Sequence, residues 1–498
     1  MICLSCTESS LESDLLVIEK NRNFIDIVEI RADFLDAADY KNLVSLPKKT
    51  GLPCILTFRR PEDGGVNPGL GRDERAAMMS AALDGGWAYI DIEDDADADS
   101  ERQLIKDAEA AGTRIIKSFH DFSGVPDNLA ERMIENSKGD RYIAKAAVMP
   151  ENTAGLFKII DAHRKLRELR ISSEGYSCTN GPLFTDYILV GMGACGFPSR
   201  VMAAAWGSML TFSSAGSTKA APGHISPAEL VDVYNYHALT DETELFGIIG
   251  NPVMHSKSPA LHNAAIRANG LDAVYLPFET ADPEIILEHA CEINLKGLSV
   301  TIPHKQKVLD FAASLDDSVK SIGACNTLVN DKGWRGYNTD WSGFLQPLES
   351  EILENRSALV IGAGGAARAV VYALVSRGMK VVIVNRSPEK AEALAADFGC
   401  RGGGFELMSE EFSAQNGRQP LLAVQTTSVG TAPNIEGNPV PDFDLSGVGI
   451  AYDIIYTPEK TAFLGAAEAA GCRIINGFPM LKAQAARQFH LFTGRPME

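Results

Sequence analysis

Residues 357–378 read SALVIGAGGAARAVVYALVSRG, a strand-like run, a glycine-rich turn and a long helical pattern in direct succession. The apolar run at 357–361 has the length and composition of a buried strand. The glycines that follow fit the spacing G-x-G-x-x-A, and a second strand, KVVIVNRS, begins at Lys380. This order of strand, turn, helix and strand predicts the opening of a dinucleotide-binding Rossmann domain, which we place at 346–477.

The glycine-rich turn is suited to a pyrophosphate. Gly362 and Gly364 allow a tight turn and a close approach of the phosphates, and Ala367 is small enough for the helix to pack on the strand. The N-terminus of that helix supplies N–H donors and a partial positive charge. The predicted cofactor-binding residues are Gly362, Ala363, Gly364, Gly365, Ala366, Asn385, Arg386, Ser387, Lys390, Thr427 and Gly477.

The end of the second strand bears on the choice of nicotinamide cofactor. An NAD site usually has an acidic residue there, which binds the ribose hydroxyl groups. This chain has NRSPEK at 385–390, with two cations, Arg386 and Lys390, and no acidic residue at the strand end. Two cations beside small polar groups suit a 2′-phosphate, so we predict NADP(H). The alternative is a solvated basic turn that binds nothing.

A small α/β unit is predicted before the Rossmann domain, at 245–345, and the amphipathic segment 478–498 is expected to join it. Its motifs are GNPVMHSKSPALHN (250–263), LSVTIPHK (298–305), ACNTL (324–328) and YNTDW (337–341). A lysine beside an aspartate can move a proton to a carbonyl oxygen while a hydride arrives at its carbon, which suggests Lys305 and Asp340. The alternatives are a surface ion pair for these two residues and a helix cap for Ser256 and Ser258.

The first 236 residues alternate short β-rich runs with helical stretches such as ERAAMMSAALDGG and ERQLIKDAEAAG. Eight strands with helices between them predict a (β/α)₈ barrel, an α/β fold that typically takes about 250 residues. The polar stretch at 237–244 is the expected linker. The predicted strands are 2–6, 26–30, 53–58, 88–93, 113–119, 142–148, 187–193 and 209–214.

One of these strands, YIAKAAVMP at 142–150, places Lys145 in the middle of an apolar run. A buried ammonium is costly, so we expect burial to lower the pKa of Lys145 and to leave a neutral amine. A neutral amine attacks a ketone and forms a Schiff base, which makes the neighbouring C–H bond acidic. The alternative is an ion pair of Lys145 with Glu29 or Glu93 that closes the barrel.

Other ionisable residues fall at the C-terminal ends of the predicted barrel strands or in the loops after them, where such barrels carry their chemistry. We expect His120 to act as the general base, because its unperturbed pKa lies near ~6.5, and Glu93 to orient the imidazole. The arginines would bind a carboxylate and hydroxyl groups. The full set is Glu29, Arg31, Arg59, Glu93, His120, Lys145 and Arg200.

The composition limits the classes of partner expected for this chain, which has 498 residues and a formal net charge of −19. Non-specific nucleic-acid binding needs a basic face, so none is expected. No apolar run approaches the ~20 residues of a membrane span, and no signal peptide is recognisable, so no membrane association is expected. Nine cysteines lack a paired framework, which favours a reducing cytoplasm and no metal at Cys3 and Cys6.

Several spaced motifs in residues 1–235 resemble those of the type I 3-dehydroquinate dehydratase family. They are EIRAD (29–33), TFRR with a following GG (57–65), Asp91 with Glu93, FHDF (119–122), the lysine strand ending in VMP, GFPSR and APG (221–223). The resemblance implies that Lys145 forms the Schiff base, that His120 is catalytic and that Glu93 supports it. It also implies substrate binding by Glu29, Arg31, Arg59 and Arg200.

One loop departs from that family, in which the closing segment usually has the sequence Ser-Ala-Pro-Gly-Gln. Residues 220–224 are AAPGH, so Ala220 and His224 stand in the serine and glutamine places. Two contacts of the loop that closes over the substrate are therefore expected to differ from those of the family, whereas the expected catalytic residues are unchanged.

The four motifs of the small unit, with NGFPMLKAQAARQF near the C-terminus, resemble the shikimate dehydrogenase family over 245–498. The resemblance implies that Lys305 and Asp340 are the catalytic pair and that Ser256 and Ser258 bind a carboxylate. Ser299 replaces the asparagine of many stand-alone members and is typical of fused members of the plant type. Further substrate contacts are implied at Thr301, Asn326, Tyr456 and Gln484.

The two resemblances together imply a bifunctional enzyme with small-molecule substrates. It would dehydrate 3-dehydroquinate and then reduce 3-dehydroshikimate to shikimate with NADPH. One alternative is an NAD-dependent quinate/shikimate oxidoreductase, which the NRSPEK turn argues against. Another is a transcriptional regulator built on degenerate copies of these domains, but Lys145, His120, Lys305 and Asp340 are all present and no basic DNA-binding module is found. The oligomeric state stays open.

Overall fold

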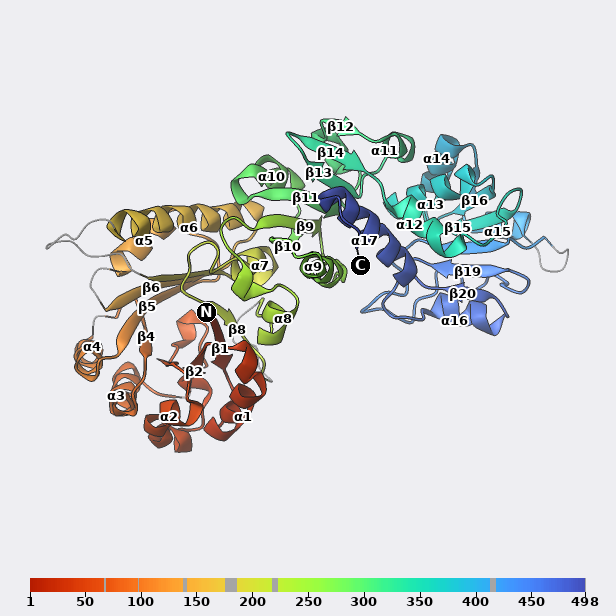
Figure 1. Ribbon diagram of the computed structural model, residues 1–498. Coiled ribbons are helices and arrows are strands. Elements are labelled where there is room, and N and C mark those ends of the chain that lie inside the picture. The colour runs from red at the N-terminus through yellow and green to blue at the C-terminus, as the bar shows by residue number, and fades with distance from the viewer. Residues whose placement is uncertain are drawn as a thin grey trace. The chain divides into compact units, whose positions relative to one another are not determined.

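Two compact units make up the chain (Figure 1). The computed structural model describes residues 1–66, 69–96, 98–137, 141–174, 186–216, 223–412 and 418–497. The first unit comprises Met1–Leu245, Pro252–Pro259 and Leu271–His289. The second comprises Phe246–Asn251, Ala260–Gly270 and Ala290–Glu498. The first unit thus includes two segments beyond the predicted linker at 237–244.

The first unit contains eight parallel strands in the order β7-β6-β5-β4-β3-β2-β1-β8. Because β1 pairs with both β2 and β8, the sheet curves into a nearly closed barrel (Figure 1), which confirms the predicted fold. The strands are β1 (Ile2–Cys6), β2 (Ile27–Arg31), β3 (Cys54–Thr57), β4 (Tyr89–Glu93), β5 (Arg114–Asp121), β6 (Tyr142–Val148), β7 (Tyr187–Gly191) and β8 (Thr211–Ser213).

Helices separate the barrel strands along the chain. They are α1 (Leu11–Asn21), α2 (Leu46–Thr50), α3 (Arg72–Ala82), α4 (Asp99–Ala111), α5 (Leu129–Asn136), α6 (Thr153–Glu174), α7 (Gly193–Val201) and α8 (Pro227–Asp232). Helix α4 shows how the sequence sets their ends. Glu101 accepts a hydrogen bond from Ala98 N–H at its start, and Gly112 ends it with a φ of +77°, which favours glycine.

Side chains of β6 alternate between the inside of the barrel and its helical cover. Ala144 and Val148 belong to a cluster of buried side chains formed with α5 and α6. Ile143 and Ala147 pack inside the barrel with residues of the other strands. Lys145 lies between Ile143 and Ala147 and, with the strand period of two, points to the same face, so its side chain enters the barrel interior.

A second sheet follows the barrel, with the strand order β10-β9-β11-β13-β14-β12. Its strands are β9 (Glu244–Gly250), β10 (Ala273–Glu279), β11 (Leu295–Val300), β12 (Ser314–Leu315), β13 (Thr327–Asn330) and β14 (Trp334–Tyr337). The helices of this region are α9 (Ser258–Ala268), α10 (Pro283–Glu288), α11 (Asp317–Ile322) and α12 (Asp340–Leu345).

The third sheet is parallel, with the order β17-β16-β15-β18-β19-β20, the strand order of a Rossmann fold. Its strands are β15 (Ser357–Ile361), β16 (Lys380–Val384), β17 (Arg401–Gly403), β18 (Leu422–Gln425), β19 (Ile450–Asp453) and β20 (Arg473–Ile475). Its helices are α13 (Gly365–Ser376), α14 (Pro388–Phe398), α15 (Glu406–Glu411) and α16 (Ala462–Ala469), and α17 (Phe478–Thr493) ends the chain. The strand order reverses between β15 and β18, which is where such sheets bind dinucleotides.

Candidate active sites

A layer of polar side chains crosses the barrel interior directly above an apolar layer. Each polar residue lies two positions after an inward apolar residue of its strand, so the strand period of two directs both inward. Strand pairing aligns the layer, because Ser5 lies opposite Glu29 and Ser118 opposite Lys145. The buried polar residues of this layer are Ser5, Glu29, Thr57, Asp91, Ser118 and Lys145.

Lys145 is the buried cation of this layer. Its Nζ lies 2.6 Å from Asp91 Oδ2 and 3.4 Å from Glu29 Oε1, and 4.3 Å from the centroid of the Phe212 ring. Two carboxylates and an aromatic ring thus surround Nζ, so burial is not the only influence on this side chain. The alternative ion pair with Glu29 is present, and the shorter contact is to Asp91.

Asp91 joins Lys145 to Arg59. Its Oδ1 lies 2.9 Å from Arg59 Nη2 and accepts a hydrogen bond from the Ser118 hydroxyl at 2.6 Å. Burial opposes ionisation of this carboxyl, but the charges of Arg59 and Lys145 outweigh it and hold its pKa below the ordinary value. Asp91 is therefore an anion between two cations.

His120 has Asp63 as its neighbouring carboxylate. Nδ1 of the ring lies 3.5 Å from Asp63 Oδ1, which is longer than an ordinary hydrogen bond. Burial and the nearby Arg59 charge lower the pKa of His120 to about 4, so the imidazole is neutral at pH 7. Glu93 Oε1 accepts a hydrogen bond from Arg59 Nη1 at 3.2 Å. That Glu93 orients the His120 ring stays a prediction.

The predicted barrel residues line a single cavity of about 330 Å³, apart from Glu93. Arg31 is held there by two hydrogen bonds to Asp33, at 2.7 and 2.8 Å. Burial lowers the pKa of Arg200 to about 10, so this guanidinium stays charged at pH 7. The lining residues that were predicted are Glu29, Arg31, Arg59, His120, Lys145, Arg200 and His224. Ala220 lies outside the described residues.

In the second unit, Lys305 and Asp340 form a close pair. Lys305 Nζ donates to Asp340 Oδ2 at 2.6 Å, and both side chains are largely buried. The other oxygen, Oδ1, accepts from Asn326 Nδ2 at 2.8 Å. The orientation of the Asn326 amide follows from its partners, because Asn326 Oδ1 accepts from Thr339 N–H at 2.7 Å. The pair is thus buried and oriented, unlike the surface ion pair that was the alternative.

Two glutamines of α17 complete this cluster. Gln484 Oε1 lies 3.3 Å from Asn326 Nδ2, in line with the prediction of a shared site. Gln488, one helical turn later, donates to the Asn326 carbonyl oxygen and to the Thr327 hydroxyl, both at 3.0 Å. It also accepts a hydrogen bond from Ser299 Oγ at 2.9 Å.

The glycine-rich turn lies between β15 and α13. Gly362 has a φ of +112°, and a Cβ there would lie 2.5 Å from Thr426 Oγ1, so the turn requires glycine. A Cβ at Gly364, the N-cap of α13, would meet nothing within 4 Å among the described residues. A Cβ at Gly365 would lie 3.5 Å from Lys305 Cδ, which places the turn beside the lysine–aspartate pair.

These features fit a dinucleotide, since the helix N-terminus faces open space and lies next to Lys305. Of the predicted 2′-phosphate residues, Arg386 and Lys390 are exposed, and Asn385 Nδ2 donates to the Ser387 carbonyl oxygen at 3.1 Å. Gly477 is the N-cap of α17, and a Cβ there would lie 2.0 Å from the Ile454 carbonyl oxygen. Ala363, Ala366 and Thr427 belong to the segments that follow β15 and β18.

The remaining predicted substrate residues are placed as follows. Ser256 Oγ accepts a hydrogen bond from Ser258 N–H at 3.2 Å, at the first residue of α9, so the cap-like geometry is present. Both serines belong to the first compact unit. Thr301 N–H donates to the Ile249 carbonyl oxygen at 3.0 Å, and Tyr456 is half-buried after β19.

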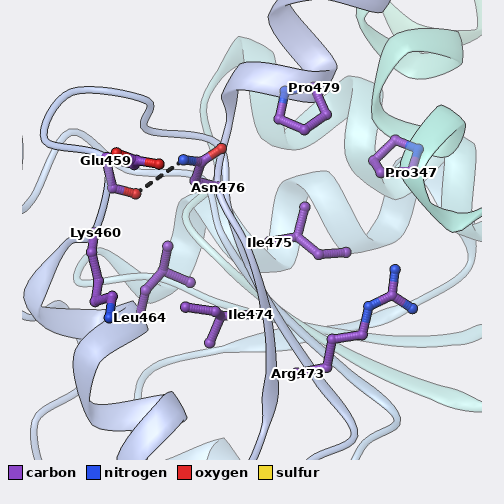
Figure 2. A pocket seen from close by; sticks show the side chains of 9 residues that line it. All are labelled: Pro347, Glu459, Lys460, Leu464, Arg473, Ile474, Ile475, Asn476 and Pro479. Carbon is purple, nitrogen blue, oxygen red and sulfur yellow. Dashed lines mark hydrogen bonds between the residues drawn. The ribbon is translucent and has the colours of Figure 1, made fainter.

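A second hollow, of about 660 Å³, is lined by residues of β20 and of the segments next to it, and not by Lys305 or the glycine turn (Figure 2). Figure 2 shows Arg473 and Lys460 at its sides and Asn476 donating to the Glu459 carbonyl oxygen. None of the predicted site residues lines it. Its size therefore does not mark it as the active site.

Comparisons with known proteins agree with both halves of this geometry. Residues 2–241 match the family model of type I 3-dehydroquinase. Residues 248–328 match the shikimate dehydrogenase substrate-binding domain, and residues 347–410 match shikimate/quinate 5-dehydrogenase. The bifunctional 3-dehydroquinate dehydratase/shikimate dehydrogenase of Arabidopsis thaliana is 31% identical over 100% of this chain and 82% of its own length.

The chain belongs to this bifunctional family. The shikimate dehydrogenase (NADP(+)) of Carboxydothermus hydrogenoformans is 40% identical over 51% of this chain and 94% of its own. The solved structure of dehydroquinate dehydratase and shikimate dehydrogenase from S. pombe AroM is 24% identical, covers 100% of this chain and 96% of that one, and has a TM-score of 0.43. In the described part of this dehydratase/dehydrogenase, no helix is long and apolar enough to cross a membrane.

Sequence reasoning missed three residues of the bifunctional enzyme's sites. Asp91 was detectable, because it lies two positions before Glu93 on one strand and so shares its face. Asp63 follows β3 in a turn without periodicity, and only the folded turn brings it to His120. Gln488 was also detectable, since it lies four residues after Gln484 on the predicted helix.

Proposed function

We propose that the barrel dehydrates 3-dehydroquinate through an imine on Lys145 and that the second half reduces 3-dehydroshikimate to shikimate with NADPH. The observation that carries the first step is the cavity that Lys145, His120 and Arg200 share. A buried lysine amine, a neutral imidazole and a buried cation for a carboxylate are the groups that such a dehydration needs.

Formation of the imine begins with Lys145. The Lys145 amine, which lies 2.6 Å from Asp91 and 3.4 Å from Glu29, adds in its unprotonated form to the substrate ketone. Loss of water from this adduct, with uptake of one proton, leaves an iminium ion on Lys145. The two carboxylates then stabilise the iminium charge.

Removal of the hydroxyl group follows at His120. The neutral imidazole takes a proton from the carbon next to the iminium carbon, and the electron pair of that C–H bond moves into the iminium. The resulting enamine expels the hydroxyl group one carbon further on, and the imidazolium returns its proton so that water leaves. Hydrolysis of the conjugated imine releases the product and regenerates Lys145.

In the second half, NADPH supplies the hydride to the carbonyl carbon. Lys305 hydrogen-bonds the carbonyl oxygen and gives it a proton, and Asp340 orients Lys305 through the 2.6 Å contact. Asn326 fixes Asp340 from the other side. Ser256 and Ser258 bind the substrate carboxylate, and Thr301, Tyr456 and Gln484 contact the remainder of the substrate.

One assay tests both steps together. Purified protein receives 3-dehydroquinate and NADPH, and the oxidation of NADPH is followed. Lys145→Ala should abolish oxidation from 3-dehydroquinate and retain it from added 3-dehydroshikimate, because only the first step uses Lys145. Borohydride with 3-dehydroquinate should add mass at Lys145. A folded wild-type protein that oxidises no NADPH would sink the proposal, and an unmodified Lys145 would refute the imine.

The choice of NADP(H) rests on Arg386 and Lys390, which are exposed beside the turn after β16. Replacing both with alanine should raise KM for NADPH about tenfold or more and leave KM for NADH nearly unchanged, because only NADPH carries the 2′-phosphate. An equal change for both cofactors would favour an NAD-dependent quinate/shikimate oxidoreductase.

We also propose a cytoplasmic location, which the eight free cysteines among the described residues support. Fractionation of source cells tests it.

A further inference from the structure

The end of β10 contacts two barrel segments within the first compact unit (Figure 1). The carbonyl oxygen of Glu279 accepts a hydrogen bond from the Cys195 thiol at 3.3 Å. The hydroxyl group of Thr280 lies 2.6 Å from that of Thr153, and both are buried. Cys195 belongs to α7 and Thr153 opens α6, the helices that directly follow β7 and β6. The barrel therefore fixes the backbone at Glu279.

The side chain of Glu279 makes a separate contact. Its Oε2 accepts a hydrogen bond from the backbone N–H of Val253 at 3.0 Å, and Val253 is buried. A buried N–H requires a partner, and a carboxylate is a strong acceptor. The Val253 carbonyl oxygen accepts from Ser256 N–H at 3.0 Å, and Ser256 Oγ accepts from Ser258 N–H. Three consecutive hydrogen bonds thus connect Glu279 to both serines.

We propose that Glu279 is a positioning residue of the dehydrogenase and that the barrel holds it in place through Cys195 and Thr153. The inference rests on the proposed function, which takes Ser256 and Ser258 as the residues that bind the substrate carboxylate. Without Glu279 Oε2, the turn at 253–256 loses its anchor and both serine hydroxyls lose their fixed position. Because these serines bind substrate and transition state alike, KM rises and kcat changes little.

Removing only the charge of Glu279 distinguishes a positioning role from direct contact with the substrate. A carboxylate that faced the substrate carboxylate would repel it, and Glu279→Gln would then lower KM. A carboxylate that accepts the Val253 N–H can be replaced by an amide oxygen, so Glu279→Gln keeps the anchor and leaves KM unchanged. Glu279→Leu keeps much of the volume and removes the acceptor.

Steady-state oxidation of shikimate with NADP⁺ by the full chain tests the side-chain contact. Glu279→Leu should raise KM for shikimate about tenfold, because it leaves the buried Val253 N–H without an acceptor, with kcat and KM for NADP⁺ within about twofold. Glu279→Gln should restore the wild-type KM. Glu288→Leu, at an exposed glutamate of α10, is the control. An unchanged KM in Glu279→Leu, or a rise that glutamine does not rescue, overturns the proposal.

Thr153→Val tests the part played by the barrel. It removes the hydroxyl that faces Thr280 and should raise KM for shikimate about threefold, as for one neutral hydrogen bond. Thr113→Val is the matched control, because the Thr113 hydroxyl is equally buried and donates to the Trp87 carbonyl oxygen at 2.9 Å. Equal KM values in the two variants would refute the role of the barrel.

Hydrogen exchange distinguishes a failure of this inference from a failure of the proposed function. If the wild-type protein oxidises no shikimate, the proposed function fails, but the anchor can still be measured. Exchange of the amides at 253–258 should be faster in Glu279→Leu than in Glu279→Gln, because only leucine leaves Val253 N–H without its acceptor. Equal exchange in the two variants overturns the positioning role by itself.

Discussion

Lys145→Met replaces the buried ammonium with an apolar side chain of similar length. Asp91 then keeps Arg59 and Ser118 as partners, and Glu29 keeps the hydroxyl groups of Ser5 and Thr57. Removing one member of a buried ion pair typically costs about 3–5 kcal/mol, because the remaining charge stays desolvated. We expect a loss of about 3 kcal/mol in the free energy of unfolding of the barrel at pH 7, since Asp91 keeps its other cation.

The matched control is Lys158→Met. Lys158 Nζ lies 2.6 Å from Asp127, the same distance as the Lys145–Asp91 contact, but both side chains are largely exposed. An exposed pair contributes about 0–1 kcal/mol, because water solvates both charges once the pair is broken. The difference between the two variants therefore measures the effect of burial at equal distance.

The pH dependence of the stability of Lys145→Met gives a sharper test, because it depends on the pKa of Glu29. Burial opposes ionisation of Glu29, but Lys145 and Arg31 outweigh it and hold its pKa below the ordinary value. Without Lys145, burial should raise the pKa of Glu29 in the folded variant above its unfolded value. The folded variant then binds more protons than the unfolded chain, so its stability deficit relative to wild type shrinks as the pH falls from 7 toward 5.

Denaturant titrations at pH 5, 6 and 7 give the free energy of unfolding. Hydrogen exchange of peptides from β4 to β6 is the probe, so the stability of the barrel is measured separately from that of the rest of the chain. Equal losses in Lys145→Met and Lys158→Met would refute the reasoning. So would a deficit in Lys145→Met that does not change with pH.

Three further outcomes test the two sites. The dehydratase kcat/KM should stay level from pH 7 to about pH 5, because the reaction needs a neutral imidazole and the pKa of His120 is about 4. A kcat/KM that falls to half its value near pH ~6.5 would contradict this assignment. Asp63→Asn should lower the dehydratase kcat about tenfold and leave the dehydrogenase rate unchanged, as measured on one sample. Gly343→Ala places a methyl group of α12 2.9 Å from Gln484 Cβ of α17. The clash should displace α12 with Asp340 and lower dehydrogenase kcat/KM about tenfold. An unchanged rate would show that α12 and α17 separate freely.

The sequence was sufficient to predict the architecture, because the spacing of residues within each strand, turn and helix identifies that element. The apolar run of β6 predicts a buried strand, and the strand period of two places Lys145 on the same face as Ile143 and Ala147. The glycine spacing after β15 predicts a tight turn, and Gly362 has the positive φ that such a turn needs. The convergence of Glu29, His120 and Arg200 on one cavity follows from the rule that barrel strands end at one edge.

Contacts between elements were not predictable in the same way. Which carboxylates contact Lys145 depends on distances to side chains of other strands, which sequence spacing does not give. Asp63 reaches His120 from the short helical turn Pro61–Asp63 after β3, which no apolar period in the sequence predicts. Glu93 was expected at His120 from its strand position and from the family resemblance, neither of which gives its contact with Arg59, a residue that follows β3.

The alternation along β6 also determines which changes in length the barrel tolerates. Deleting one residue between Tyr142 and Lys145 would move every later side chain to the opposite face. Lys145 would then point toward α5 and α6, and Ala146 would take its place in the cavity. In proteins that descend from such a barrel, insertions and deletions should therefore be confined to the loops between strands and helices, while the strands diverge by substitution.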